Sequence, residues 1–132
     1  NKPINIFNYG NMLRGFIYID DIVNCICLCC DKPATKDSNF DYSSTLPSSS
    51  FAPHRIFNIG NSKPIELTHF IQLLEEEIGK KAIKNFQEMQ IGDVLTTSAN
   101  MDSIKKWVGF EPKVDLKDGI KLFVKWYKNY LN

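Results

Sequence analysis

Residues 8–21 read NYGNMLRGFIYIDD, and this stretch predicts a turn, an extended run and a helix in immediate succession. The Asn-Tyr-Gly-Asn of residues 8–11 is typical of a tight turn. The apolar and aromatic residues 16–19 favour an extended segment. Asp20 then fits the N-cap of a helix, and Asp21 suits the positive end of its dipole. The stretch therefore favours a mixed α/β chain.

The same alternation of strand and helix signals continues on both sides of this stretch. Short β-branched and aromatic runs predict strands, and apolar residues at 3.6-residue spacing predict helices. Gly79 is expected to end one helix, and Asp115 is expected to cap another. The predicted strands are residues 4–7, 55–59 and 81–86, and the predicted helices run from beyond Pro64 to Gly79, over residues 100–108, and from Asp115 onward.

Each predicted helix carries an apolar stripe that is expected to be buried. For the helix that Asp20 begins, the stripe is Ile22, Val23, Ile26 and Cys30. For the last helix, the expected buried face is Leu116, Ile120, Phe123, Tyr127 and Leu131. Residues 31–53 are rich in Ser, Pro, Asp and Thr, and they predict a long, exposed and flexible loop without a packed core. Such a loop is either a lid or a tolerated insertion, and the second is the commoner case.

Composition excludes several classes of function. The net charge of +1 over 132 residues argues against an electrostatic nucleic-acid binder. The longest apolar stretch is too short to span a bilayer. Four cysteines at positions 25, 27, 29 and 30 cannot close one tetrahedral metal site from a helix, so they are expected to be small buried hydrophobes in a reducing compartment. The chain opens without methionine, and we expect it to be a piece of a longer protein.

Two short segments carry polar groups that suit a phosphate or a sugar. Arg14 lies between a turn and an extended run, and a guanidinium is well suited to gripping a diphosphate. Asp93 follows Gly92 in a second turn, where its carboxylate would accept hydrogen bonds from ribose hydroxyls, with Gln90 beside it. On local grounds alone, a surface arginine and an ordinary turn aspartate are the commoner interpretations.

The order of these segments is more specific than any one of them. It resembles the C-terminal half of the extended short-chain dehydrogenase/reductase family, and most closely the UDP-glucuronate 4-epimerases. The resemblance implies an α/β substrate-binding part spanning residues 1–132, without the Rossmann core of such enzymes. It is carried by residues 2–21, 55–61, 90–94, 98–100, 109–112 and 119–127.

The resemblance also implies roles for individual residues. Arg14 is similar to the family arginine that binds the substrate diphosphate, and Asp93 to the acid that holds the ribose. Gln90 stands where many relatives carry a second phosphate-binding arginine. Asn5 and Phe7 lie on the strand that lines the base pocket in relatives. Thr97 falls only loosely near the sugar-binding region, so we assign it no role.

For the whole protein, the resemblance implies a cytoplasmic, homodimeric enzyme of UDP-sugar conversion, acting in bacterial surface polysaccharide synthesis. An N-terminal Rossmann domain would bind NAD and supply a Tyr-x-x-x-Lys pair for hydride transfer at sugar C4. Neither a dinucleotide fingerprint nor that pair occurs in this sequence, so we expect the chain to be inactive alone.

Three departures leave the exact reaction open. Gly15 stands where the family usually has an aspartate, Ile91 where it has a proline, and Asn100 where it has an aspartate. A dTDP-glucose 4,6-dehydratase or another nucleotide-sugar enzyme remains an alternative within the family. A non-catalytic binding domain is the alternative from another class.

Overall fold

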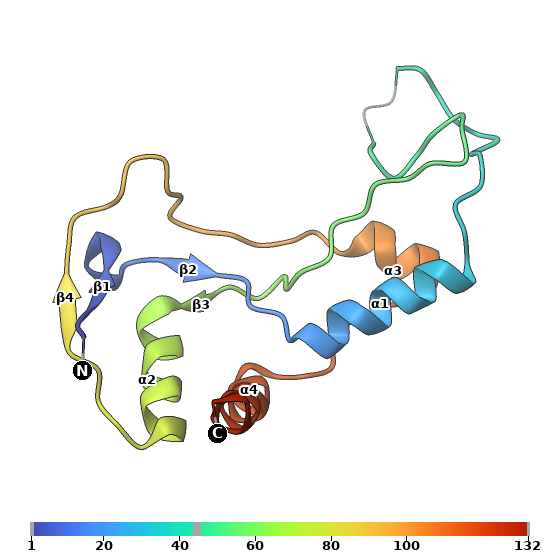
Figure 1. Cartoon of the computed structure of the whole chain (residues 1–132). Coiled ribbons are helices and arrows are strands. Elements are labelled where there is room, and N and C mark those ends of the chain that lie inside the picture. The colour runs from blue at the N-terminus through green and yellow to red at the C-terminus, as the bar shows by residue number, and fades with distance from the viewer. Residues whose placement is uncertain (1, 44–45, 132) are drawn as a thin grey trace.

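The computed structural model describes residues 2–43 and 46–131, which form a mixed α/β chain with short strands and longer helices (Figure 1). The predicted fold class is confirmed. In chain order the elements are β1 (Ile4–Ile6), the 3-10 helix η1 (Phe7–Gly10), β2 (Leu13–Arg14), α1 (Ile19–Asp31), β3 (Ile65–Glu66), α2 (Leu67–Ile78), β4 (Lys84–Phe86), α3 (Asp102–Val108) and α4 (Leu116–Tyr130).

Two small sheets bring distant parts of the chain together. β1 pairs in parallel with β4, with Ile4 opposite Lys84, and β2 pairs antiparallel with β3. Leu13 also forms an isolated parallel bridge with Thr96. The segment after β4 therefore runs past both β1 and β2, and this path positions the candidate site.

The predicted turn at residues 8–11 is present as η1. Asn8, Tyr9 and Gly10 all have positive φ, at 48°, 51° and 84°. Asn and Gly tolerate this left-handed backbone better than other residues. The Asn8 side-chain amide also donates to the Asn11 carbonyl over 2.8 Å, which closes the turn.

Helix α1 begins two residues earlier than predicted. Its N-cap is Tyr18, which makes no side-chain cap hydrogen bond, so the assignment of Asp20 as the cap was wrong. Asp21 lies in the first turn and is buried, where its carboxylate accepts hydrogen bonds from the backbone N–H groups of Lys113 and Val114. These two hydrogen bonds link α1 to the segment that leads into α4.

The core lies on another face of α1 than the sequence predicted. Cys25, Ile104 and Phe110 form the buried cluster, whereas Val23 and Ile26 remain about half exposed, at 49% and 50%. The pKa of the Cys25 thiol is raised to about 11, chiefly by burial. The expectation for the other cysteines was partly wrong, because Cys27 and Cys30 are exposed and Cys29 is half-buried.

The last helix also buries a narrower face than expected. Asp115 caps it as predicted, by accepting from the Asp118 N–H over 2.9 Å. Ile120 is buried as predicted, and Val124 joins it. The remaining predicted face was wrong for three large side chains that stay substantially exposed, which are Phe123, Tyr127 and Leu131.

Helix α2 ends at Gly79 as predicted, and Gly79 is left-handed with a φ of 77°. Its buried face includes an unexpected carboxylate, Glu75, which pairs with Lys81 and Lys84 and accepts from the Ala82 N–H. The hydrogen bond from Lys84 is the largest cause that lowers the pKa of Glu75 to about 2. Glu75 thereby ties α2 to the connection that leads into β4.

The predicted strands have mixed outcomes. β1 and β4 confirm two of them with shorter bounds, and the predicted helix at residues 100–108 is α3. The predicted strand at residues 55–59 and the extended run at residues 16–19 form no ladder with any residue that the structure describes. The physical reason is the lack of a neighbouring strand, since a strand needs a partner for its backbone groups.

The loop that follows α1 projects away from the rest of the chain (Figure 1). In the described part of residues 31–53 there is no helix beyond the end of α1 and no strand. The rings of Phe40, Tyr42 and Phe51 contact one another. Tyr42 and Phe51 remain largely exposed and no described residue of this loop belongs to the buried core, which agrees with the expected exposed loop. Residues 44–45 of this predicted loop lie outside the described residues.

Candidate functional site

The candidate site is built on β2, where Arg14 lies opposite Ile65 of β3. On its other side, β2 is joined to the segment after β4. The Leu13 N–H donates to the Leu95 carbonyl over 2.9 Å, and the Thr97 N–H donates to the Leu13 carbonyl over 3.1 Å. These two hydrogen bonds bring the turn that contains Asp93 next to Arg14, although 79 positions separate the two residues.

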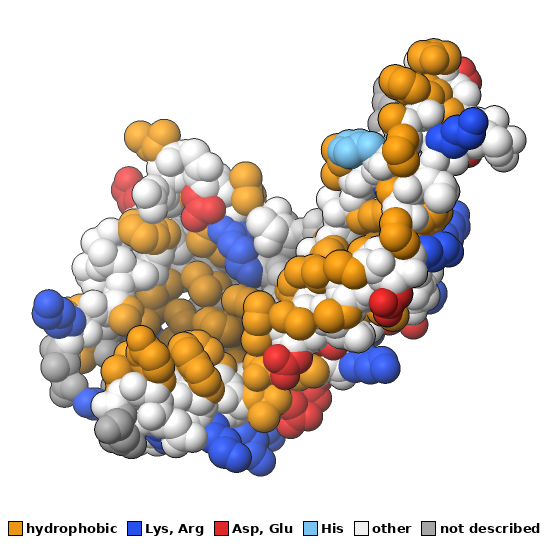
Figure 2. Space-filling model, turned by 45° about the vertical axis from the view of Figure 1, so that its right-hand side comes forward, with side chains coloured by type: hydrophobic (Ala, Val, Ile, Leu, Met, Phe, Trp, Pro, Cys, Tyr) orange, Lys and Arg blue, Asp and Glu red, His pale blue; other side chains and the backbone are white. Residues whose placement is uncertain are grey.

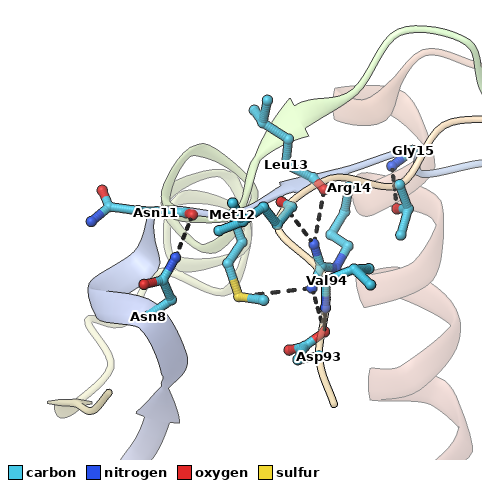
Figure 3. Close-up of polar contacts among 10 residues, drawn as sticks. Asn8, Asn11, Met12, Leu13, Arg14, Gly15, Asp93 and Val94 are labelled. Atoms are coloured by element: carbon cyan, nitrogen blue, oxygen red, sulfur yellow. Dashed lines mark hydrogen bonds and ion pairs between the residues drawn. The ribbon is translucent and has the colours of Figure 1, made fainter. Parts of the chain in front are cut away.

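The guanidinium of Arg14 is held by four acceptors (Figure 3). Nη1 donates to the carbonyls of Leu13 and Leu95, at 3.0 and 3.2 Å. Nη2 donates to Met12 Sδ at 3.7 Å and to Asp93 Oδ1 at 2.8 Å. A guanidinium has five N–H donors, so only the Nε donor takes no part in these contacts. The cation is therefore fixed in one orientation before any ligand arrives.

Asp93 is presented by a tight turn. Its backbone N–H donates to the Gln90 carbonyl over 3.1 Å, and Gly92 supplies the left-handed residue with a φ of 86°. Asp93 Oδ1 accepts from both Arg14 and the Val94 N–H. Asp93 Oδ2 takes part in neither contact, so it remains able to accept from another donor.

The pair is accessible from solvent. The side chains of Arg14 and Asp93 keep 22% and 33% of their surface exposed. An exposed ion pair contributes little to stability, on the order of 1 kcal/mol or less. Its chemistry is more informative, because a fixed cation with a free N–H stands beside a carboxylate with a free oxygen. Such a pair can bind an anion and a hydroxyl-bearing group that are joined in one ligand.

The structure brings some of the sequence-predicted residues together and leaves others apart. Gln90 belongs to the same turn as Asp93, and its side chain is exposed. Asn5 and Phe7 lie on β1 and η1, and the Asn5 side-chain oxygen accepts from the Asn85 amide at 3.0 Å. No contact among the described residues joins the side chains of Asn5 or Phe7 to Arg14.

Gly15 and Thr97 shape the backbone beside the pair. The Gly15 N–H donates to Thr97 Oγ1 over 3.3 Å. A Cβ atom on Gly15 would lie 2.8 Å from the Asn61 carbonyl oxygen, which is closer than real Cβ atoms approach, and 3.2 Å from the Thr97 carbonyl oxygen, which is a tight contact. The side-chain-free residue is therefore required by this backbone.

Sequence reasoning missed three groups that hold Arg14. Met12, whose sulfur accepts from Arg14, is buried, and the other two groups are the backbone carbonyls of Leu13 and Leu95. No local pattern marks any of them, because a backbone carbonyl can occur at any residue and a buried methionine is ordinary core material.

No protein-family model matches the chain. Protein CapI of Staphylococcus aureus is 39% identical over 130 residues, which cover 98% of this chain and 39% of that protein. The probable UDP-glucuronate 4-epimerase of Rhizobium meliloti is 37% identical and is matched over 98% of this chain and 38% of its own length. The chain thus spans about two fifths of the length of these relatives.

Solved structures show the same relationship. UDP-glucuronic acid 4-epimerase from Bacillus cereus, in complex with UDP-glucuronic acid and NAD, superposes with a TM-score of 0.74 at 26% identity. The match covers 98% of this chain and 36% of that one. The chain is homologous to part of the UDP-glucuronate 4-epimerases, which confirms the resemblance to extended short-chain dehydrogenases/reductases.

Among the described residues, no helix has both the length and the apolar character that crossing a bilayer requires.

Proposed function

We propose that this chain is the nucleotide-sugar-binding portion of an NAD-dependent nucleotide-sugar 4-epimerase that acts on UDP-glucuronate and UDP-galacturonate. The homology to enzymes of this name supports the reaction class. The observation that carries the assignment of the site is the contact between Arg14 Nη2 and Asp93 Oδ1 at 2.8 Å. Two groups from distant segments, each suited to one part of a nucleoside diphosphate, converge on one spot.

Arg14 is the proposed diphosphate-binding residue. Its Nε donor is free, and the other four N–H groups hold the guanidinium in place. A cation that is fixed in advance loses little conformational entropy when the phosphate binds. Charge-assisted hydrogen bonds to phosphate are roughly twice as strong as neutral ones.

Asp93 is the proposed ribose-binding residue, through its Oδ2 atom. A ribose hydroxyl is a donor, and an ionised carboxylate only accepts, so the two are complementary. The same carboxylate lies against Arg14, which offsets its repulsion of a neighbouring diphosphate. Gln90, in the same turn, is proposed to contact the phosphates as a neutral donor, and Asn5 and Phe7 are proposed to line the base pocket.

NAD is assigned to a part of the protein that this chain does not include. The sequence offers no glycine-rich fingerprint for a dinucleotide and no Tyr-x-x-x-Lys pair. An N-terminal Rossmann domain of the same protein is proposed to hold both, and the chain alone is proposed to be inactive. The role of the chain is to anchor the nucleotide, so that binding energy from a non-reacting part of the substrate supports the chemistry at the sugar.

Incubation of the full-length protein with UDP-glucuronate tests the proposal. We expect UDP-galacturonate as the product, with no net oxidation of the sugar, and no conversion by the 132-residue chain. Loss of water to give a 4-keto-6-deoxy sugar from dTDP-glucose would identify a dehydratase instead. Binding of UDP-sugars without conversion by the full-length protein would identify a non-catalytic binding domain.

A further inference from the structure

The projecting loop that follows α1 is fastened at both ends to Trp107 of helix α3. At its start, Lys32 Nζ donates to the Trp107 carbonyl over 2.6 Å, and the Trp107 indole N–H donates back to the Lys32 carbonyl over 3.2 Å. Where the loop returns, the Arg55 guanidinium lies over the Trp107 ring, with Cζ 4.6 Å from the ring centroid. Figure 2 shows the loop standing clear of the rest of the molecule, with hydrophobic, basic and acidic side chains on the face in view. The base of the loop is therefore held against α3.

A cavity of about 540 Å³ lies between this base and α3. Sites for small ligands commonly have volumes of about 300–1,000 Å³. Most of the lining side chains are polar or aromatic, among them Ser48, Arg55, Ser103, Lys106 and Trp107. None of the lining residues belongs to the pair of Arg14 and Asp93. The cavity is thus separate from the candidate nucleotide site.

Arg55 is the buried cation of this cavity, and its side chain keeps only 11% of its surface exposed. Nη1 donates to the Ser48 carbonyl over 2.6 Å and lies 3.7 Å from Asp37 Oδ2. Among the residues that the structure describes, the buried Nε has no hydrogen-bond partner and Nη2 makes no polar contact. Nε and Nη2 form one edge of the guanidinium, and such an edge binds the two oxygens of a carboxylate or phosphate.

The carboxylates that line the cavity are engaged within the loop. Asp37 Oδ1 accepts from the Asn39 N–H, and Asp37 Oδ2 accepts from the Ser49 hydroxyl over 2.9 Å. Asp41 accepts from both the N–H and the hydroxyl of Ser43. The unpaired guanidinium edge therefore finds no acceptor in the described part of the chain.

Helix α3 (Asp102–Val108) adds a second cation and a hydroxyl to the same cavity. Lys106 and Trp107 follow Ser103 by three and four positions, so all three residues lie on one face of the helix. Lys106 is exposed and makes no ion pair with any described residue. The Trp107 ring stacks with that of Phe57, at 6.1 Å between centroids, and both rings line the cavity. Two cations, a hydroxyl and an aromatic wall thus converge on one space.

We propose that this cavity binds a small organic anion, a sugar acid or a sugar phosphate, whose charged group lies between Arg55 and Lys106. A buried cationic donor without a partner is costly, and a carboxylate or phosphate supplies the missing acceptor. Ser103 bonds a hydroxyl of the ligand, and the aromatic wall contacts its carbon skeleton. A clamp that only held the loop would explain the stacking of Arg55 on Trp107, but it would leave Nε unpaired.

Titration of the full-length protein with D-glucuronate, glucose 1-phosphate and neutral glucose, with UDP in excess to fill the nucleotide site, tests the proposal. A ligand of this size is expected to bind with a dissociation constant on the order of 1 mM. Glucose should bind at least about tenfold more weakly than the better anion, because it makes no charge-assisted contact. The tighter of the two anions identifies the charged group as carboxylate or phosphate. Equal binding of glucose, or no saturable binding of either anion, would overturn the proposal.

Two neighbouring lysines of α3 provide a matched pair of variants. Lys106 lines the cavity, whereas Lys105 lies outside it, with Nζ 2.5 Å from Glu111 Oε1. Lys106→Gln should weaken anion binding at least about tenfold, and Lys105→Gln should change it less than about twofold. Equal effects of the two variants would show that the protein attracts an adventitious ion only, and this outcome refutes the site.

Arg55→Lys tests the planar edge, because it keeps the charge and removes the paired donors. We expect this variant to lose anion binding at least about tenfold as well. Its melting temperature is measured alongside, since Arg55 also holds the Ser48 carbonyl. Unchanged anion binding by the folded variant would refute the assigned role of Arg55, and Lys106→Gln decides the matter if Arg55→Lys does not fold.

Discussion

Replacement of Arg14 by alanine in the full-length protein should weaken UDP binding by about 10- to 150-fold. This loss of affinity follows from the number of Arg14 N–H donors that make no contact within the protein. Four of its five N–H groups are engaged within the protein, so one free donor, on Nε, is available to the diphosphate. One charge-assisted hydrogen bond contributes about 1.5–3 kcal/mol, and each 1.4 kcal/mol corresponds to a factor of ten in the dissociation constant.

The same substitution has a second effect on the site. It removes the ion pair in which Arg14 Nη2 lies 2.8 Å from Asp93 Oδ1. The Asp93 carboxylate is then left without a cation, and an unpaired carboxylate repels a diphosphate. The double variant Arg14→Ala/Asp93→Asn removes that repulsion. We therefore expect the double variant to bind UDP better than the sum of the two single losses would predict, and a double-mutant cycle measures this difference.

Isothermal titration with two ligands separates the two roles. Uridine keeps the ribose and lacks the phosphates, so Arg14→Ala should leave uridine binding almost unchanged while it weakens UDP binding. Asp93→Asn should weaken the binding of both ligands. Equal losses for uridine and UDP in the Arg14→Ala variant, or no loss for UDP, would refute the assignment of Arg14 to the diphosphate.

Three further outcomes follow from the structure. Gly15→Ala should lower the melting temperature, because its Cβ would lie 2.8 Å from the Asn61 backbone carbonyl oxygen. Gly119→Ala should lower it less, because its Cβ would lie 3.3 Å from the Tyr18 side chain, which can shift more easily than backbone. The pKa of Glu75 is lowered to about 2, chiefly by the hydrogen bond from Lys84, so the ionised Glu75 stabilises the fold above the unfolded pKa near 4.5, and this stabilisation is lost as the pH falls toward 2. The urea midpoints of wild type and Glu75→Gln should therefore converge as the pH falls over that range. A difference that stays constant with pH would contradict this prediction. The 132-residue chain alone should self-associate in sedimentation experiments, because it exposes many large apolar side chains, and a stable monomer with a cooperative melt would count against this.

The parts of the fold that the sequence predicted well are those with a local cause. Gly79 ends α2 because a left-handed residue is needed there, and Asp115 caps α4 because its side chain reaches the Asp118 N–H. The turn before Met12 depends on residues that tolerate positive φ. Each of these signals depends on neighbours within four positions, so no knowledge of the rest of the molecule was needed.

The buried faces of the helices were harder to predict, because a helix with apolar residues on several sides does not show which side meets the core. On α1, Cys25 was the residue buried, and the larger Val23 and Ile26 stayed half exposed. On α4, which also has apolar residues on several sides, Ile120 and Val124 are buried and the larger Phe123 and Tyr127 are exposed. Apolar character alone does not distinguish a face that packs in this chain from one that would pack on another part of a longer protein.

The candidate site was predictable in its residues but not in its geometry. Arg14 and Asp93 were each identified from the sequence as residues suited to bind a phosphate and a ribose, and the resemblance to a family placed both in one binding site. Their contact, however, depends on the pairing of Leu13 with the segment at Leu95 and Thr97. That pairing is between residues more than eighty positions apart, and no local pattern specifies its register.

Glu75 shows where a local pattern could have been used further. It lies four residues after the buried Ile71, on the apolar face of α2, where an acidic side chain is costly unless it is paired. Its position therefore predicts a cation partner, and the Lys-rich segment that follows Gly79 is the nearest source of one. The ion pairs with Lys81 and Lys84 confirm that logic, and they also fix the chain entering β4. Since β4 leads directly to the Gln90–Asp93 turn, a carboxylate outside the candidate site helps to set the path on which Asp93 reaches Arg14.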